Sequence, residues 1–111
     1  MAQAQIVPLT IPAGESLSDS LDVTAGEASY VLTPGEWDSA NVTFEISFDN
    51  VTFWDLFDEY GREVMLACEP GVGVLMHSGL QSTGYFKIRS GTRDNPVPQS
   101  EDRNFKVVFW S

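Results

Sequence analysis

The sequence is poor in the residues on which cross-linking, imidazole catalysis and nucleic-acid binding depend. Its 111 residues include one cysteine, one histidine and six lysines and arginines. A single cysteine cannot form a disulfide within the chain, which argues against a small secreted domain held together by disulfides. Six bases against 16 acids give a formal net charge of -10. A chain this acidic is poorly suited to binding a nucleic acid or an anionic membrane surface.

Long apolar segments are also missing. No stretch approaches the roughly 18 apolar residues that a membrane-spanning helix requires. The first 16 residues have no basic start and no continuous apolar run, and Pro8 and Pro12 interrupt them. We therefore expect no secretory signal, no membrane partner, and synthesis in the cytoplasm of the producing cell.

The missing residues argue against an enzyme as well. His77 is the sole histidine, so a triad or an acid–base pair built on imidazoles is not available. The sequence has no nucleophile elbow and no phosphate-binding loop. Cys68 lies beside the turn at 69–71, and we interpret it as a small apolar residue rather than a nucleophile. We expect no catalytic activity and no cofactor.

The acids leave one metal-binding alternative open. Asp55, Asp58, Glu59 and Glu63 are close in the sequence, and calcium prefers carboxylate oxygens as ligands. Their spacing is not that of an EF-hand loop, and acid-rich loops are usually just solvated. Calcium is therefore kept only as an alternative to the expectation that no metal is bound.

The residues that are present follow a period of two. In 41–49, Val42, Phe44, Ile46 and Phe48 alternate with polar residues, which predicts a half-buried strand. The same alternation predicts strands at 85–89 and 104–109. A turn at 49–50 and a returning segment at 51–57 predict a hairpin. Weaker strand candidates are 6–11, 16–23, 29–33, 63–67 and 73–76.

The breaks between these segments carry turn residues. Glycine and proline occur together at 12–14, 33–35 and 69–71, and Pro96 and Pro98 mark a long polar loop at 91–103. Eight or nine short strands separated by such turns predict an all-β fold, a single antiparallel β-sandwich or jelly roll. We expect one domain over 13–111, with 1–12 as either an extended N-terminal arm or the first strand.

Three groups of residues are candidates for contacts with a partner. Trp37 and Trp54 could anchor a protein interface or stack on sugar rings, or they could fill the core. The apolar residues of the N-terminal segment could add a strand to a partner sheet or face the core of this domain. These residues are Ile6, Val7, Leu9 and Ile11.

The third group is defined by charge. Residues 1–86 contain 13 acids and one base, a net charge of -12, whereas residues 87–111 contain five bases and three acids, a net charge of +2. The arginines Arg89, Arg93 and Arg103 could therefore meet the acidic part of a second copy. The alternative is that they pair with acids of the same molecule.

Several segments together resemble one family of small structural proteins from tailed phages and prophages. They are spread over most of the chain and include Ile11–Ser20 (IPAGESLSDS), Pro34–Trp37 (PGEW), Val42–Phe48 (VTFEISF), Phe53–Phe57 (FWDLF), Gly61–Val64 (GREV), Lys87–Thr92 (KIRSGT), Pro96–Gln99 (PVPQ) and Asp102–Arg103. Their order is also similar to that of small jelly rolls of the galactose-binding type.

The resemblance implies a non-enzymatic protein of the virion. Its expected role is that of a capsid decoration or cement protein that binds the lattice of the major capsid protein at the capsid surface. It implies a homo-oligomer, such as a trimer, and assigns no functional residues. The alternatives are a carbohydrate-binding module for host adhesion and a tail or head-completion subunit.

Overall fold

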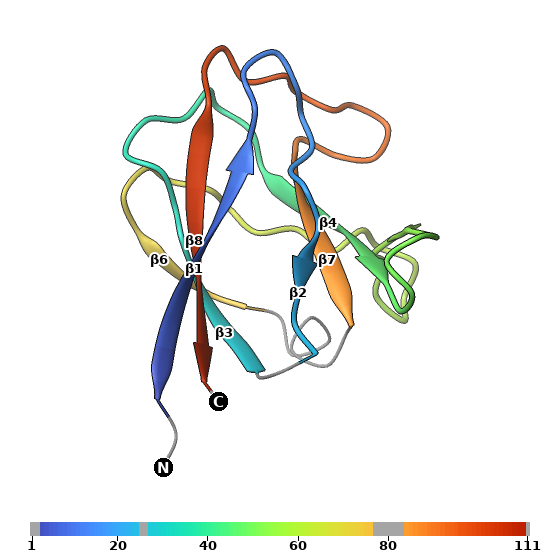
Figure 1. Ribbon diagram of the computed structural model, residues 1–111. Coiled ribbons are helices and arrows are strands. Elements are labelled where there is room, and N and C mark those ends of the chain that lie inside the picture. Colours follow the sequence, from blue (N-terminus) through green and yellow to red (C-terminus); the bar gives the residue numbers. More distant parts are fainter. Residues whose placement is uncertain (1–2, 25–26, 77–83, 111) are drawn as a thin grey trace.

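The structure, a computed structural model, describes residues 3–24, 27–76 and 84–110. These residues form eight strands and no helix (Figure 1). No segment among them forms a helix that is long and apolar enough to cross a membrane. The strands are β1 (Ala4–Ile11), β2 (Leu21–Asp22), β3 (Glu27–Leu32), β4 (Val42–Ser47), β5 (Trp54–Asp55), β6 (Gly73–Leu75), β7 (Tyr85–Ser90) and β8 (Arg103–Trp110).

The strands make two four-stranded antiparallel sheets. One sheet has the order β1-β8-β3-β6 and the other has the order β2-β7-β4-β5. The first strand pairs with the eighth, the second with the seventh, the third with the sixth and the fourth with the fifth. This is the pairing of a long hairpin rolled up on itself, which is the topology of an eight-stranded jelly roll. The predicted all-β fold, an antiparallel β-sandwich, is confirmed.

The core lies between the two sheets. Phe44, Phe86 and Phe105 are fully buried, and the rings of Phe44 and Phe86 meet edge to face with 6.1 Å between their centroids. Strand β8 shows why the sequence folds this way, because its residues alternate strictly between inward and outward positions. Arg103, Phe105, Val107 and Phe109 are buried, and the residues between them are exposed or half-buried.

The N-terminal segment is the first strand of the domain. Strand β1 runs antiparallel to β8 over its whole length, from Ala4 opposite Trp110 to Ile11 opposite Arg103. It is an edge strand, and Pro8 fits there because proline has no N–H to donate to a further neighbour.

Several strands are shorter than the sequence predicts. The polar side chains near them bind backbone groups and replace the hydrogen bonds of a sheet. The hydroxyl of Ser18 accepts from the N–H of Ile88, and β2 contains only two residues of the predicted 16–23. Strand β5 contains two residues of the predicted 51–57. The strand predicted at 63–67 is wrong, because Glu63 and Leu66 make only isolated bridges, to Phe57 and to Val42.

Candidate interaction surfaces

Arg89 organises the outer face of the sheet β2-β7-β4-β5. Its Nη2 lies 2.6 Å from Glu45 Oε2 and 2.6 Å from Asp55 Oδ1, and its Nη1 lies 3.3 Å from Glu63 Oε2. The three acids come from β4, from β5 and from the segment after β5. Although Arg89 points away from the core, only 8% of its side chain is exposed, because these segments cover it.

Arg89 keeps its positive charge although it is buried. Burial alone would lower the pKa of Arg89, but its hydrogen bonds to Asp55 and Glu45, together with the attraction of these two carboxylates, outweigh burial and raise the pKa above the ordinary value. Arg93 adds a second cation, with its Nε 3.1 Å from Asp55 Oδ2 and its backbone N–H donating to Glu63. The cluster therefore ties the irregular segments around β5 and after β7 to the sheet.

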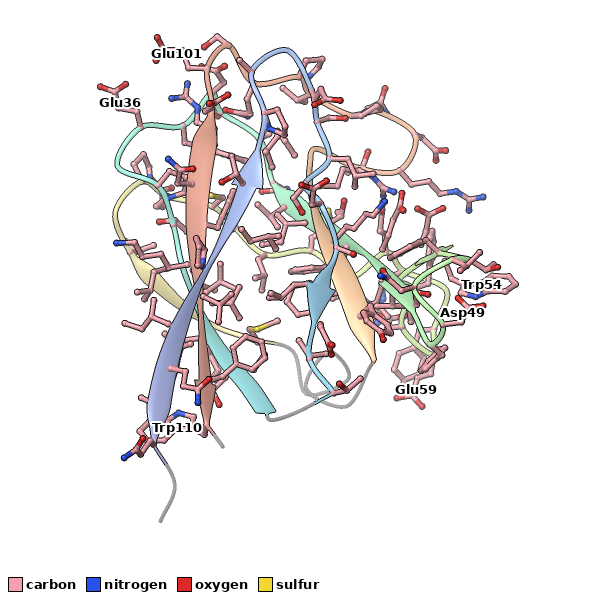
Figure 2. The ribbon with its side chains drawn as sticks, in the orientation of Figure 1. Glu36, Asp49, Trp54, Glu59, Glu101 and Trp110 are labelled. Atoms are coloured by element: carbon pink, nitrogen blue, oxygen red, sulfur yellow. The ribbon has the colours of Figure 1, made fainter. Side chains whose placement is uncertain are left out.

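Arg103 sits in a similar cluster at the end of the sandwich. Its Nε donates to the buried side chain of Gln99 over 3.0 Å, and its Nη2 lies 3.2 Å from Asp38 Oδ1. Glu36 and Glu101 lie farther away, at 4.0 Å and 3.9 Å from Nη1. These two acids border an open, shallow pocket of about 250 Å³ and are labelled at the same end of the molecule in Figure 2.

The two clusters explain the uneven distribution of charge along the sequence. Two of the five basic residues near the C-terminus, Arg89 and Arg103, lie inside the fold and pair with acids of the same molecule. Arg89 and Arg103 are both buried, so a partner does not reach them without disturbing the fold. Of the three predicted arginines, Arg93 alone has a largely exposed side chain.

The acids considered as calcium ligands serve other purposes. Asp55 and Glu63 bind Arg89, and Asp58 accepts the backbone N–H groups of Tyr60 and Arg62. Glu59 is exposed. Among the residues that the structure describes, no group of three or more acids, histidines or cysteines is placed to hold a metal ion.

Most of the predicted apolar contact residues belong to the core. Leu9 and Ile11 are buried, and Val7 is partly buried against them. Trp37 is half-buried, its ring meets Phe105 edge to face at 5.3 Å, and its Nε1 donates to the carbonyl of Ala40. These four residues therefore act in folding, and Ile6 and Trp54 remain as the exposed members of the predicted set.

Cys68 also packs against the core. Burial, with a smaller contribution from the neighbouring charge of Glu69, raises the pKa of its thiol to about 11. The thiol is therefore protonated at neutral pH, as expected of an apolar packing residue. His77 lies outside the described residues.

One exposed surface, here called the aromatic edge, surrounds β5 at the rim of the sandwich. Figure 2 shows Trp54 there, together with the acidic residues Asp49 and Glu59. Trp54 is 60% exposed and Tyr60 is 74% exposed. The exposed apolar residues of this edge are Phe48, Val51, Trp54, Phe57 and Tyr60.

Aspartates shape the loops of the aromatic edge. The Asp49 carboxylate accepts the backbone N–H groups of Val51 and Thr52 at 2.9 Å, which holds the turn between β4 and β5. The hydrogen bond from Thr52, then those from Val51 and the Ser47 hydroxyl, lower the pKa of Asp49. Asn50, inside this turn, has a positive φ of 60°, which asparagine tolerates better than most residues.

Cations of the chain itself lie over three rings in this region. Lys87 Nζ is 4.3 Å from the centre of the Phe53 ring, Arg93 lies over Phe57, and Arg62 lies over Tyr60. Trp54 has no stacked ring or cation of this kind among the described residues. Its indole is therefore the largest ring of the edge that is open to a partner.

A second surface, here called the open face, is the outer face of the sheet β1-β8-β3-β6. The register places Ile6 opposite Val108, Val108 opposite Tyr30, and Tyr30 opposite Leu75, so that one row crosses all four strands. The adjacent row contains Pro8, Lys106, Leu32 and Gly73. On the other side, Trp110 pairs with Ala4 and with the backbone of Glu27.

The open face is mainly apolar, and none of the segments that the structure describes covers it as the other sheet is covered. Ile6 is 59% exposed, Leu75 is 65% exposed, and Tyr30 and Trp110 are each 44% exposed. Trp110 and Trp54 lie on different sides of the molecule (Figure 2). The sequence alone does not predict a surface formed by Tyr30, Leu75 and Trp110, because their alignment depends on strand register.

Comparison of the chain with protein-family models, with curated proteins and with solved structures gives no match. The two exposed surfaces of this chain are therefore the basis for inferring its function.

Proposed function

We propose that the chain is a non-enzymatic structural protein of a phage particle. In this proposal it is a decoration protein that binds the major capsid protein at the capsid surface through the aromatic edge. A single domain whose buried arginines are neutralised internally is well suited to serve as a preformed block in an assembly. The segments that resemble the phage family support the same role.

The observation that carries the proposal is the composition of the aromatic edge. Trp54, Tyr60 and Phe57 are exposed there beside Arg62 and Arg93. Tryptophan, tyrosine and arginine are the residues that most often dominate the binding energy of protein interfaces. Such residues bind most strongly where a partner removes them from water, as a capsid lattice does over a bound subunit.

The first test asks whether the chain belongs to a particle. Particles purified from the producing cells should contain the 12.2 kDa chain in many copies spread over the head. A few copies at one vertex would favour a tail or head-completion subunit instead. Complete absence from the particles would contradict the virion proposal.

The second test asks whether the aromatic edge makes the contact. Particles stripped of the chain are mixed with Trp54→Ala, and with Trp110→Ala as a matched loss of an exposed tryptophan elsewhere. We expect Trp54→Ala to weaken binding by a factor of ten or more, as loss of an interface anchor does. Equal binding by both variants would exclude the aromatic edge as the capsid contact.

Glycan binding is the second candidate function, and the open indole of Trp54 favours it. An exposed tryptophan ring without an internal partner can stack on a sugar ring. This function predicts saturable glycan binding that Trp54→Ala abolishes and Trp110→Ala leaves intact. Trp37→Ala is not informative here, because Trp37 packs against Phe105 in the core.

A further inference from the structure

We propose that the open face binds a second copy of this chain, forming a two-fold dimer in which the two β1-β8-β3-β6 sheets pack face to face. The inference does not depend on the virion proposal, which uses the aromatic edge. It rests on the exposure of this face, on its charge, on its self-complementarity and on its area.

Exposure is the first argument. Ile6, Tyr30 and Leu75 belong to one row across four strands and are all exposed. Large apolar side chains that lie scattered on a surface need no explanation, but a continuous row of them on a flat sheet is a typical interaction site. The equivalent face of the other sheet is covered by the segments that surround Arg89.

Charge identifies a second copy as the occupant. The chain has a net charge of -10, so two copies repel each other in most orientations. No residue in the two central rows of the open face is acidic, and Lys106 is basic. When two copies approach through these faces, they keep acids out of the centre of the contact and bring one cation from each copy towards an acidic molecule. The acid of these four strands, Glu27, pairs with Trp110 at the end of the sheet.

The two-fold symmetry of a dimer and the area of the open face are both compatible with a second copy as the partner. In a two-fold interface the same patch meets itself, which suits a patch that is apolar rather than strongly charged. The four strands contain 8, 8, 6 and 3 residues. With about 3.3 Å per residue and about 4.8 Å between strands, the face projects to roughly 400 Å². Two faces with their side chains bury on the order of 1,000 Å², the lower limit for a specific interface.

This area predicts a weak dimer, with a dissociation constant in the micromolar range. Sedimentation equilibrium of the full chain should therefore show a concentration-dependent rise from 12.2 kDa to twice that mass. Rising salt should strengthen the dimer severalfold, because it screens the repulsion between two acidic molecules and leaves the apolar contact in place. An interface made of ion pairs would weaken instead.

Variants locate the contact. Leu75→Glu and Ile6→Glu introduce a carboxylate at opposite edges of the open face, and each should lower the association constant at least tenfold. Val51→Glu is the matched control, because it adds the same charge at an exposed position of the aromatic edge. A far-ultraviolet circular dichroism spectrum and a thermal melt check that each variant is folded, and two independent variants guard against a folding defect in one.

The outcomes separate this inference from the virion proposal. A chain that remains monomeric at all concentrations, forms a trimer, or dimerises as before in both open-face variants would overturn the inference. Loss of the dimer in Val51→Glu alone would also overturn it and place self-association at the aromatic edge. A monomer that still binds particles would contradict only this inference, whereas a dimer that is absent from particles would contradict only the virion proposal.

Discussion

The outer faces of the two sheets carry very different residues. On the sheet β2-β7-β4-β5, Arg89 lies among three carboxylates and is covered by segments without regular structure. On the sheet β1-β8-β3-β6, the two central rows contain no acid, and their residues Ile6, Tyr30 and Leu75 are exposed. On the first sheet, ion pairs hold the surrounding segments of the same chain in place. On the second sheet, the centre of the outer face is free of acids. Four paired substitutions or titrations test this contrast.

The largest expected effect is the loss of Arg89. Arg89→Met leaves Glu45, Asp55 and Glu63 close together without their shared cation. We therefore expect the free energy of unfolding to fall by about 3 kcal/mol. Lys106→Met removes one cation from the open face and should change stability by less than about 0.5 kcal/mol. Urea denaturation measures both. Equal losses would show that the Arg89 cluster does not hold the covering segments.

Two glycines offer a second comparison. Gly91 follows β7 with a φ of +89°, and a Cβ there would lie 2.5 Å from the carbonyl oxygen of Asn95. Gly73 lies on the open face, where a Cβ would meet only the side chain of Leu32 at 3.3 Å. We expect Gly91→Ala to cost about 2 kcal/mol or more, because the backbone must move, and Gly73→Ala to cost much less. Thermal or urea unfolding decides whether the two differ.

Acid should loosen the aromatic edge before the open face. The pKa of Asp49 is lower in the folded chain than in the unfolded chain, so its contribution is complete at neutral pH. The contribution is lost as the pH falls from about 4 through the folded pKa. The amide signals of Val51 and Thr52 should shift in this range, whereas those of Tyr30 and Leu75 should not.

Asp49→Asn is the control for this titration. The amide oxygen of asparagine still accepts a hydrogen bond but does not titrate, so the acid-induced shift at Val51 and Thr52 should disappear. If the shift persists in this variant, another carboxylate controls the turn.

The smallest expected effect concerns the two lysines of the sheets. Lys87 lies over the Phe53 ring, and Lys87→Gln should destabilise the fold by about 0.5–1 kcal/mol through loss of this cation–π contact. Lys106→Gln, on the open face, should have no measurable effect on monomer stability. A double-mutant cycle with Phe53→Leu isolates the contact between Lys87 and Phe53. A coupling energy of zero would show that this contact does not contribute to stability.

The sequence predicts the fold well where side chains alternate and poorly where polar side chains bind the backbone. The alternation in 104–109 leads directly to β8, and the turn at 49–50 leads to the β4–β5 hairpin. In contrast, Ser18 and Asp49 accept hydrogen bonds from backbone N–H groups at the predicted strands 16–23 and 51–57, which are shorter than predicted. Such bonds depend on which segments become neighbours, and periodicity alone does not report that.

The contact residues are harder to predict, because exposure depends on the whole fold. Arg89 and Arg103 have the charge expected of surface residues, but the sandwich brings acids from distant segments around them. Both Trp37 and Trp54 have the residue type expected of an interface anchor, but only Trp54 is exposed. The row from Ile6 to Leu75 exists only after β1, β8, β3 and β6 pair in register, so no single segment of sequence reveals it.

The most direct test of the contrast between the faces is oxidative footprinting of the unmodified chain at low and at high concentration. We expect Tyr30, Leu75 and Trp110 to become less reactive as the concentration rises, because a second copy covers the open face. Trp54 and Tyr60, on the aromatic edge, should keep their reactivity under the same conditions. Unchanged labelling of the open face, or protection of Trp54 in its place, would show that the open face is not the contact between copies.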